Sequence, residues 1–382
     1  MMPATLPPLS LYVHLPWCVR KCPYCDFNSY ETQGALAERP YVAALLRDLD
    51  AETAFVQDRT LASVFIGGGT PSLFSGTAIR ELVHGIRARV PLTRAAEITL
   101  EANPGAVEAA RFAAYREAGV NRLSIGLQSL RDAQLTALGR VHDAEEAVRA
   151  VDTAHGAGFD NVNVDLMYGL PGDGVEGARG DLTAAIDLNP THLSWYQLAL
   201  EPGTAFHRRP PDLPSEEIVL EIEAAGRALL AERGFERYEI SAYARGENRC
   251  VHNLNYWRFG DYIGIGAGAH GKITVRSDGA LLRRSKSRNP RTYVALAGTT
   301  AAVTVTPVDS AQARIVEFMM NALRLPDGID AALFEQRTGL PAASIAGALE
   351  TAAAHGWLTI DAGSIKPTPV GLQMLNSLLT LF

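Results

Sequence analysis

Three cysteines, Cys18, Cys22 and Cys25, fall within eight residues of the sequence. They follow Leu11–Leu15, an apolar run rich in β-forming residues that predicts a strand, and Pro16 ends this run. We therefore expect the thiols in a loop at the C-terminal end of a first strand. Such a loop can wrap around one soft metal centre, and thiolates suit zinc or an iron–sulfur cluster.

The number of clustered thiols bears on which of these centres is expected. A closed structural zinc site uses four ligands, so His14 or Asp26 would have to complete it. A four-iron cluster held by three thiolates instead leaves one iron open for another ligand. The count of three favours the cluster.

A glycine-rich turn and a carboxylate are expected near the same loop. Gly67-Gly-Gly-Thr-Pro71 follows a strand expected to end at Ile66, and glycines let the backbone approach a ligand closely. An ordinary strand-to-helix turn would rarely need three glycines. Glu101 is expected to end the third strand, where a carboxylate can accept hydrogen bonds from an ammonium group; the alternative is a plain surface charge.

The spacing Cys-x3-Cys-x2-Cys, with an aromatic residue before the last cysteine, resembles the radical SAM superfamily. Three further motifs resemble the family of oxygen-independent coproporphyrinogen III oxidase and its haem chaperone relative. They are Tyr12-Val-His-Leu-Pro16, Gly67-Gly-Gly-Thr-Pro71 and Glu101-Ala-Asn-Pro104. The likeness runs from about Leu9 to the C-terminus. It implies a [4Fe-4S] cluster on the three cysteines, S-adenosylmethionine at the open iron, and an electron donor that reduces the cluster.

The resemblance also carries over contacts with S-adenosylmethionine, residue by residue. The positions that match are Tyr12, Tyr24, Gly68, Gly69, Thr70, Glu101, Gln128, Arg140, Asp165 and Ala199. Among them, Gln128, Arg140 and Asp165 match positions that contact a second S-adenosylmethionine in the oxidase, and Ala199 resembles a backbone contact. Taken singly, a buried glutamine, a surface arginine and a capping aspartate are common structural features.

Two departures from the oxidase pattern favour the haem chaperone branch. The oxidase has a fourth cysteine two places after the third, where this chain has Phe27, and its longer N-terminal extension is not expected here. The predicted function is therefore binding of haem and its transfer to an acceptor haem protein, such as a membrane respiratory enzyme. The alternative is radical oxidative decarboxylation of coproporphyrinogen III to protoporphyrinogen IX.

A second motif, His252-Asn-Leu-Asn-Tyr256-Trp257, resembles a signature of the chaperone branch. An imidazole can ligate haem iron and aromatic rings can cover a macrocycle, so His252, Tyr256 and Trp257 are candidates for haem contact. The alternative is a packed structural motif. The adjacent Cys250 is expected to be a buried, inert thiol.

Short apolar runs alternate with helical patterns in the first half of the chain, which indicates a parallel α/β sheet. The expected strands are Leu11–Leu15, Ser63–Ile66, Glu97–Glu101, Arg122–Gly126, Asn161–Leu166 and His192–Leu198. The expected helices are Tyr41–Gln57, Gly76–Arg89, Val107–Ala118, Ala144–Ala157 and Val175–Leu188, with N-caps at Ser75, Asp143 and Asp173. The radical SAM resemblance implies a (β/α)6 partial TIM barrel, with its site at the C-terminal ends of the strands.

Three regions are expected along the chain. Residues 9–207 would form the radical SAM core, and 208–309 an extension carrying the His252 motif. Residues 310–382 would form a small α+β, winged-helix-like domain that ends in a hairpin of Trp357–Ile360 and Gly363–Pro367. Within the extension, Tyr238–Gly271 is predicted to be irregular strand and loop, and Arg276–Arg291 a solvated basic run.

The composition is that of an ordinary globular protein, with 47% apolar and 20% charged residues in 382. The net charge of −7 gives no reason to expect a nucleic-acid partner. Four cysteines, three of them clustered, are not a secreted disulfide framework, and the first residues do not read as a signal peptide. No apolar run reaches membrane-spanning length, so the sequence predicts a cytoplasmic protein.

Overall fold

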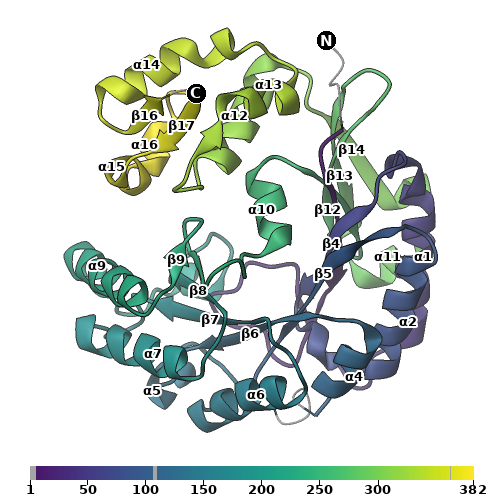
Figure 1. Cartoon of the computed structure of the whole chain (residues 1–382). Coiled ribbons are helices and arrows are strands. Elements are labelled where there is room, and N and C mark those ends of the chain that lie inside the picture. The colour runs from purple at the N-terminus through teal and green to yellow at the C-terminus, as the bar shows by residue number, and fades with distance from the viewer. Residues whose placement is uncertain (1–5, 106–109, 362) are drawn as a thin grey trace.

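Parallel strands form the curved centre of the structure, and helices cover their outer side (Figure 1). The computed structural model describes residues 6–105, 110–361 and 363–382. The parallel strands, in spatial order, are β1 (Leu9–Leu15), β4 (Leu61–Gly68), β5 (Leu92–Ala102), β6 (Arg122–Gln128), β7 (Val162–Tyr168) and β8 (His192–Gln197). The main connecting helices are α1 (Glu38–Glu52), α2 (Gly76–Arg87), α4 (Phe112–Ala118), α6 (Ala144–Gly156) and α7 (Val175–Asp187). The predicted partial barrel is confirmed.

The predicted elements agree closely with the observed ones, and their caps explain where the helices begin. The Ser75 hydroxyl accepts a hydrogen bond from the first turn of α2, and Asp143 forms a capping box at α6. The predicted cap at Asp173 is wrong. Gly174 caps α7, because the Asp173 carboxylate instead pairs with Arg131 at 2.9 Å. The expected start of the third helix, residues 107–109, lies outside the described residues.

Side-chain alternation along the strands separates two environments. One set of residues on each strand packs against the helices in a large apolar core, as Leu100, Ile125 and Val164 do. The alternate set faces the inside of the barrel, where cavities are lined by polar side chains such as Ser124 and Asp165. Barrel interiors of this kind are usually filled by branched apolar residues, so the polar lining here indicates a ligand site.

The sheet continues beyond the parallel strands at both edges. Strand β11 (Asp261–Ile265) runs parallel to β1, and antiparallel strands follow it outward: β12 (His270–Thr274), β13 (Leu281–Lys286) and β14 (Val303–Pro307). At the other edge β8 pairs with β10 (Ala242–Ala244), which pairs with β9 (Glu236–Arg237). The extension therefore adds strands to both edges of the sheet, but the barrel does not close.

Two expectations for the extension are wrong. Tyr238–Gly271, predicted as strand and loop, also contains helix α10 (Val251–Trp257), which packs against β1, β4 and β11. The basic run Arg276–Arg291 is not solvated along its length, because it includes β13. The Lys286 side chain is only 3% exposed, and its Nζ lies 2.6 Å from a carboxylate oxygen of each of Asp48 and Glu52 on α1.

The C-terminal residues form a small α+β domain, drawn in yellow-green in Figure 1, whose apolar core also includes Phe259 and Leu281 of the extension. Its helices are α12 (Ala311–Ala322), α13 (Ala331–Thr338), α14 (Ala346–Ala354), α15 (Pro369–Gln373) and α16 (Leu375–Leu379). Strands β16 (Leu358–Asp361) and β17 (Ser364–Pro367) form the predicted hairpin, and β15 (Ile329–Asp330) pairs with β17. Helices packed on this small sheet match the expected α+β domain.

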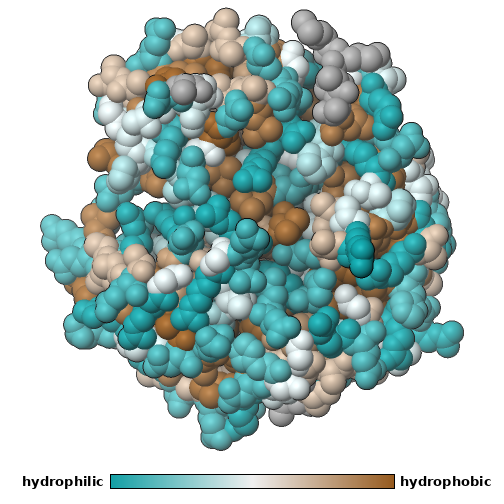
Figure 2. Space-filling view, in the orientation of Figure 1, coloured by the Kyte–Doolittle hydropathy of each residue, from teal (hydrophilic) through white to brown (hydrophobic). Residues whose placement is uncertain are grey.

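The remaining elements are short, apart from one long helix on the outside of the barrel. That helix is α9 (Glu216–Glu232), which packs against α7. The others are β2 (Trp17–Cys18), β3 (Tyr30–Glu31), α5 (Asp132–Ala137), α8 (Ala205–Arg208) and α11 (Pro290–Leu296). None of the described helices is long and apolar enough to cross a membrane. The face shown in Figure 2 is mostly hydrophilic over the barrel helices.

Candidate cluster and cofactor site

The cysteine loop leaves the end of β1 and is closed at its base by backbone hydrogen bonds. Strands β2 and β3 pair in parallel, and the Thr32 amide donates to the Cys18 carbonyl at 2.9 Å. Within the loop, the Cys25 amide donates to the Cys22 carbonyl at 3.1 Å, which makes a tight turn between those two cysteines. The Lys21 ammonium donates to the Phe27 carbonyl at 2.8 Å and holds the far side of the loop.

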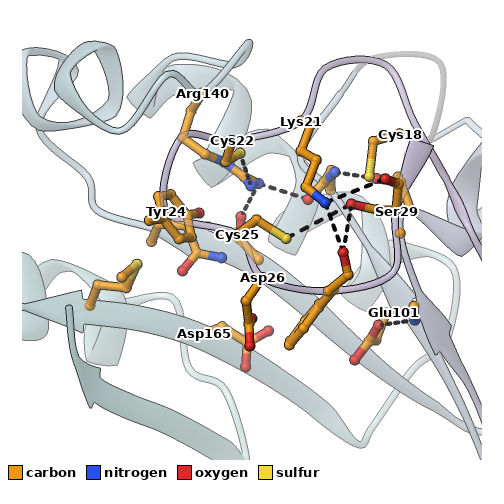
Figure 3. A pocket seen from close by; sticks show the side chains of 18 of the residues that line it. Cys18, Lys21, Cys22, Tyr24, Cys25, Asp26, Ser29, Glu101, Arg140 and Asp165 are labelled. Carbon is orange, nitrogen blue, oxygen red and sulfur yellow. Dashed lines mark hydrogen bonds between the residues drawn. The ribbon is translucent and has the colours of Figure 1, made fainter. Parts of the chain in front are cut away.

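The three loop cysteines are free, half-buried thiols that line one cavity of about 380 Å³ (Figure 3). Burial raises the pKa of the Cys18 and Cys25 thiols, while Arg140 Nη1 lies 3.6 Å from Cys22 Sγ and donates to it. Among the described residues, no three His, Cys, Asp or Glu side chains converge as the ligands of a single metal ion would. Thiolates that each bind a different iron of a cluster do not need such convergence.

The glycine turn packs directly against the cysteine loop. The Gly69 amide donates to the Leu15 carbonyl at 2.8 Å, and the Thr70 amide donates to the Trp17 carbonyl at 2.7 Å. A Cβ atom on Gly69 would lie 2.5 Å from the Trp17 carbonyl oxygen, and Gly68 has a φ of +121°. Glycine is therefore required here, because the backbone of the two segments is in contact.

Glu101 reaches the glycine turn from β5, across the cavity from Cys22 and Arg140 (Figure 3). Its Oε2 accepts a hydrogen bond from the Gly68 amide at 3.0 Å. Burial and, to a smaller extent, the nearby Asp165 carboxylate raise the pKa of Glu101 to about 8. A buried carboxyl with a pKa raised in this way is mostly protonated at neutral pH. A cationic partner that binds beside it favours the ionised form.

A hydrogen-bonded network links the other predicted residues to the loop. Arg140 Nη2 donates to the Gly126 carbonyl at 2.8 Å and to Asn103 Oδ1 at 2.7 Å. The Asn103 amide in turn donates to the Thr70 hydroxyl at 2.8 Å. The network therefore runs from the Cys22 thiol, through Arg140 and Asn103, to the glycine turn.

Gln128 and Asp165 are held in place by contacts with neighbouring side chains. Gln128 ends β6 with a positive φ of 69°, and its Oε1 accepts from the Tyr196 hydroxyl at 2.7 Å. The Asp165 carboxylate accepts from the Asn163 amide at 2.8 Å and from the Ser124 hydroxyl at 3.2 Å. Both side chains are positioned before any ligand binds.

The structure brings almost all of the predicted cluster and S-adenosylmethionine residues to this one cavity. Its lining includes Cys18, Cys22, Tyr24, Cys25, Gly68, Gly69, Thr70, Glu101, Gln128, Arg140, Asp165 and Ala199. Tyr12 is the exception, since it lines two adjoining cavities that share Glu101 with the first. Sequence reasoning missed Asn103 and Tyr196 as lining residues, although Asn103 lies within the Glu101-Ala-Asn-Pro104 motif.

The residues considered for haem contact do not all share one face. His252 and Tyr256 line an adjoining cavity inside the barrel. Trp257 packs instead against the C-terminal domain, with the Arg324 guanidinium 4.5 Å from its ring centroid. Burial lowers the pKa of His252 to about 3, so its imidazole is neutral. Cys250 is fully buried, and burial raises its pKa to about 12.

Comparisons with known proteins agree with this geometry. Residues 12–181 match the radical SAM superfamily, and residues 309–374 match the HemN C-terminal domain. The chain is 51% identical over 377 residues to the heme chaperone HemW of Escherichia coli, covering 99% of this chain and 98% of that protein. The chain belongs to the HemW family. The HemW of Haemophilus influenzae is 45% identical, with 99% of this chain and 98% of that protein covered.

The fold of this HemW-family chain is similar to that of a solved structure, the coproporphyrinogen III oxidase HemN of Escherichia coli. The TM-score is 0.82 at 24% identity, with 98% of this chain and 90% of that chain covered. Membership of the radical SAM superfamily implies a [4Fe-4S] cluster and S-adenosylmethionine. The three free thiols line a cavity that also contains Glu101, Arg140 and Asp165, and this set of side chains fits both groups.

Proposed function

We propose that this chain is a haem chaperone that carries a [4Fe-4S] cluster, binds S-adenosylmethionine, and delivers haem to acceptor haem proteins. The observation that carries the proposal is full-length similarity to HemW proteins in a chain whose thiol loop, glycine turn and Glu101 line one cavity. Phe27, where the oxidase pattern has a further cysteine, is 58% exposed and supports the same choice.

In this proposal Cys18, Cys22 and Cys25 hold the cluster, which when bound supplies one-electron chemistry to its ligand. The Glu101 carboxylate accepts from the ammonium group of S-adenosylmethionine, and the turn at Gly68, Gly69 and Thr70 lies against its methionine part. The walls contributed by Tyr12, Tyr24, Gln128, Arg140, Asp165 and Ala199 complete the contacts.

The haem site is proposed next to this cavity, at His252 and Tyr256. The Nδ1 atom of His252 lies 2.9 Å from the Ser63 hydroxyl, and that hydroxyl donates onward to Ser10. His252 Nδ1 therefore carries the proton, which leaves the Nε2 lone pair for iron. Nε2 is buried and has no hydrogen-bond partner among the described residues. Trp257 would support α10 by packing rather than by touching haem.

The remaining partners are set by chemistry. A cluster that works by one-electron reduction requires an electron donor. The haem cargo requires an acceptor protein, and we propose a membrane respiratory haem protein in contact with the cytoplasm. The acidic net charge of −7 gives no expectation of nucleic acid.

The proposal is tested on anaerobically prepared, cluster-reconstituted protein. Haem titrated into it should give a saturable change in the haem absorption spectrum, and the bound haem should pass to an apo haem protein. Histidine-ligated haem should change its spectrum in His252→Ala but not in the matched control His84→Ala, an exposed residue of α2. Conversion of coproporphyrinogen III to protoporphyrinogen IX with S-adenosylmethionine and a reductant would overturn the proposal in favour of the oxidase.

A further inference from the structure

A buried arginine, Arg122, stands at the start of β6 inside the barrel, and the site described above does not use it. It is 2% exposed. Among the described residues its side chain makes no hydrogen bond or ion pair, and its Nε is buried without a partner. Burial opposes its charge, but Cys250 and Glu97 nearby favour it, so its pKa stays above the usual value. A charged guanidinium without a bonded partner is unusual in a protein interior.

The carboxylates near Arg122 are already engaged by other donors. Glu97 accepts from the amides of Val251 and His252 at 3.1 Å each, and from the Cys250 thiol at 3.5 Å. Asp165 accepts from Ser124 and Asn163 as described above. These carboxylates balance the charge of Arg122 through space, but they leave its N–H donors free for a ligand.

The space in front of Arg122 is a cavity of about 280 Å³, which we call the inner cavity. Its walls include Arg122, Tyr12, Tyr256, His252, Asn253 and Ser194. The inner cavity shares Glu101, Ser124 and Asp165 with the cysteine-lined cavity. It also shares Tyr12, Glu101 and Tyr256 with a third cavity of about 520 Å³. A group bound beside Arg122 can therefore belong to a larger molecule that extends into the adjoining spaces.

The volume of the inner cavity and the hydrogen-bond donors in its walls indicate which chemical group it can bind. Sites for drug-sized ligands occupy roughly 300–1,000 Å³, so the inner cavity suits one side arm of a macrocycle rather than the whole ring. Arginine binds carboxylates through two parallel N–H donors of its planar fork. The Tyr256 phenol, whose pKa is raised by burial, keeps its proton and adds a further donor.

We propose that the inner cavity is a carboxylate site in which Arg122 binds one propionate of the haem cargo. The inference rests on the proposed function, because it assigns the part of the cargo that enters the barrel. The carboxylate is bound by the guanidinium, while the neutral His252 imidazole in the same wall offers a lone pair to a metal. Haem is a ligand that presents both an acid group and a metal.

The test compares haem with its dimethyl ester, in which both propionates are blocked. Wild-type protein, cluster-reconstituted and kept anaerobic, should bind haem about 10- to 100-fold more tightly than the ester, as expected for a charge-assisted pair. Arg122→Met should bind the two equally, whereas Arg94→Met, which removes an exposed arginine from neighbouring β5, should keep the preference. Equal binding of haem and ester by the wild type, or an unchanged preference in Arg122→Met, would overturn the inference.

A second measurement separates this inference from the proposed function. Sodium propionate should raise the melting temperature of the wild-type protein more than sodium chloride does at the same ionic strength, and it should not do so in Arg122→Met. If neither haem nor its ester binds, the proposed function fails. If propionate still stabilises the protein in that case, the inner cavity is a site for free carboxylates, and the assignment to the haem cargo is overturned. If Arg122→Met does not fold, Arg122→Lys replaces it. It retains the charge without the planar fork, and an undiminished preference for haem in that variant would overturn the inference.

Discussion

The affinity for S-adenosylmethionine should depend on pH through Glu101. The pKa of this carboxyl is about 8, raised first by burial and then by Asp165. In the free protein it is therefore mostly protonated at neutral pH. The ammonium group of the ligand favours the ionised carboxylate, so each binding event should release a proton from Glu101.

The size of the effect follows from the pKa. With a pKa of about 8, about 1% of Glu101 is ionised at pH 6 and about 9% at pH 7. Affinity should therefore rise about tenfold over this interval, with close to one proton released per ligand bound. An ordinary α-amino group titrates at about 7.7–8.0, so the ligand stays mostly cationic over the same range and does not offset the change.

The assay is anaerobic isothermal titration calorimetry on cluster-reconstituted protein, at pH 6.0, 6.5 and 7.0. Each titration is repeated in two buffers of different ionisation enthalpy, which gives the number of protons released. The matched control is Glu101→Gln, whose neutral amide removes the titration but leaves Asp165 in place. A wild-type affinity that does not change between pH 6 and 7, or an equal slope in Glu101→Gln, would refute the reasoning.

Three further predictions follow from the same contacts. Cys22→Ala should lose most of its iron on reconstitution because two thiolates cannot replace three, while Cys250→Ala should keep it; normal iron in Cys22→Ala would refute the cluster assignment. Lys286→Met removes the ammonium that pairs with both Asp48 and Glu52; the buried Asp48 carboxylate loses its cation, while Glu52 keeps Arg284. The substitution should lower the free energy of unfolding by about 3 kcal/mol in urea titrations; no change would show that these pairs are not stabilising. The folded Glu101 carboxyl keeps its proton up to about pH 8, whereas the unfolded one ionises near 4.5. Its contribution to stability should thus be full below pH 4.5 and fall as the pH rises to 8, and Glu101→Gln should show a flatter profile.

Local patterns determined most of the barrel and the cluster loop. Apolar runs bounded by glycine and proline marked the parallel strands, because a strand buried against helices must be apolar on that side. The three cysteines lie close together in one short loop. Their shared position at the cavity could therefore be predicted from the sequence. The glycine turn was equally visible, because contact with the Trp17 backbone excludes a side chain at Gly69.

Features that depend on contacts between distant segments were the ones the sequence misjudged. Lys286 looked solvated, yet β13 places it against carboxylates on α1, more than two hundred residues earlier in the chain. The separation of Trp257 from His252 follows from α10, which presents one side to the barrel and another to the C-terminal domain.

Arg122 shows the same limit most clearly. In the sequence it is only a charged residue at the start of a predicted strand. Its burial beside Glu97, and the engagement of that carboxylate by α10, arise only when the extension folds against the barrel. Most of the residues that line the cysteine-containing cavity could be predicted from the sequence, because they lie in local motifs at strand ends. Which interior charges are left without a partner follows from the folded structure alone, because pairing depends on the positions of side chains far apart in the chain.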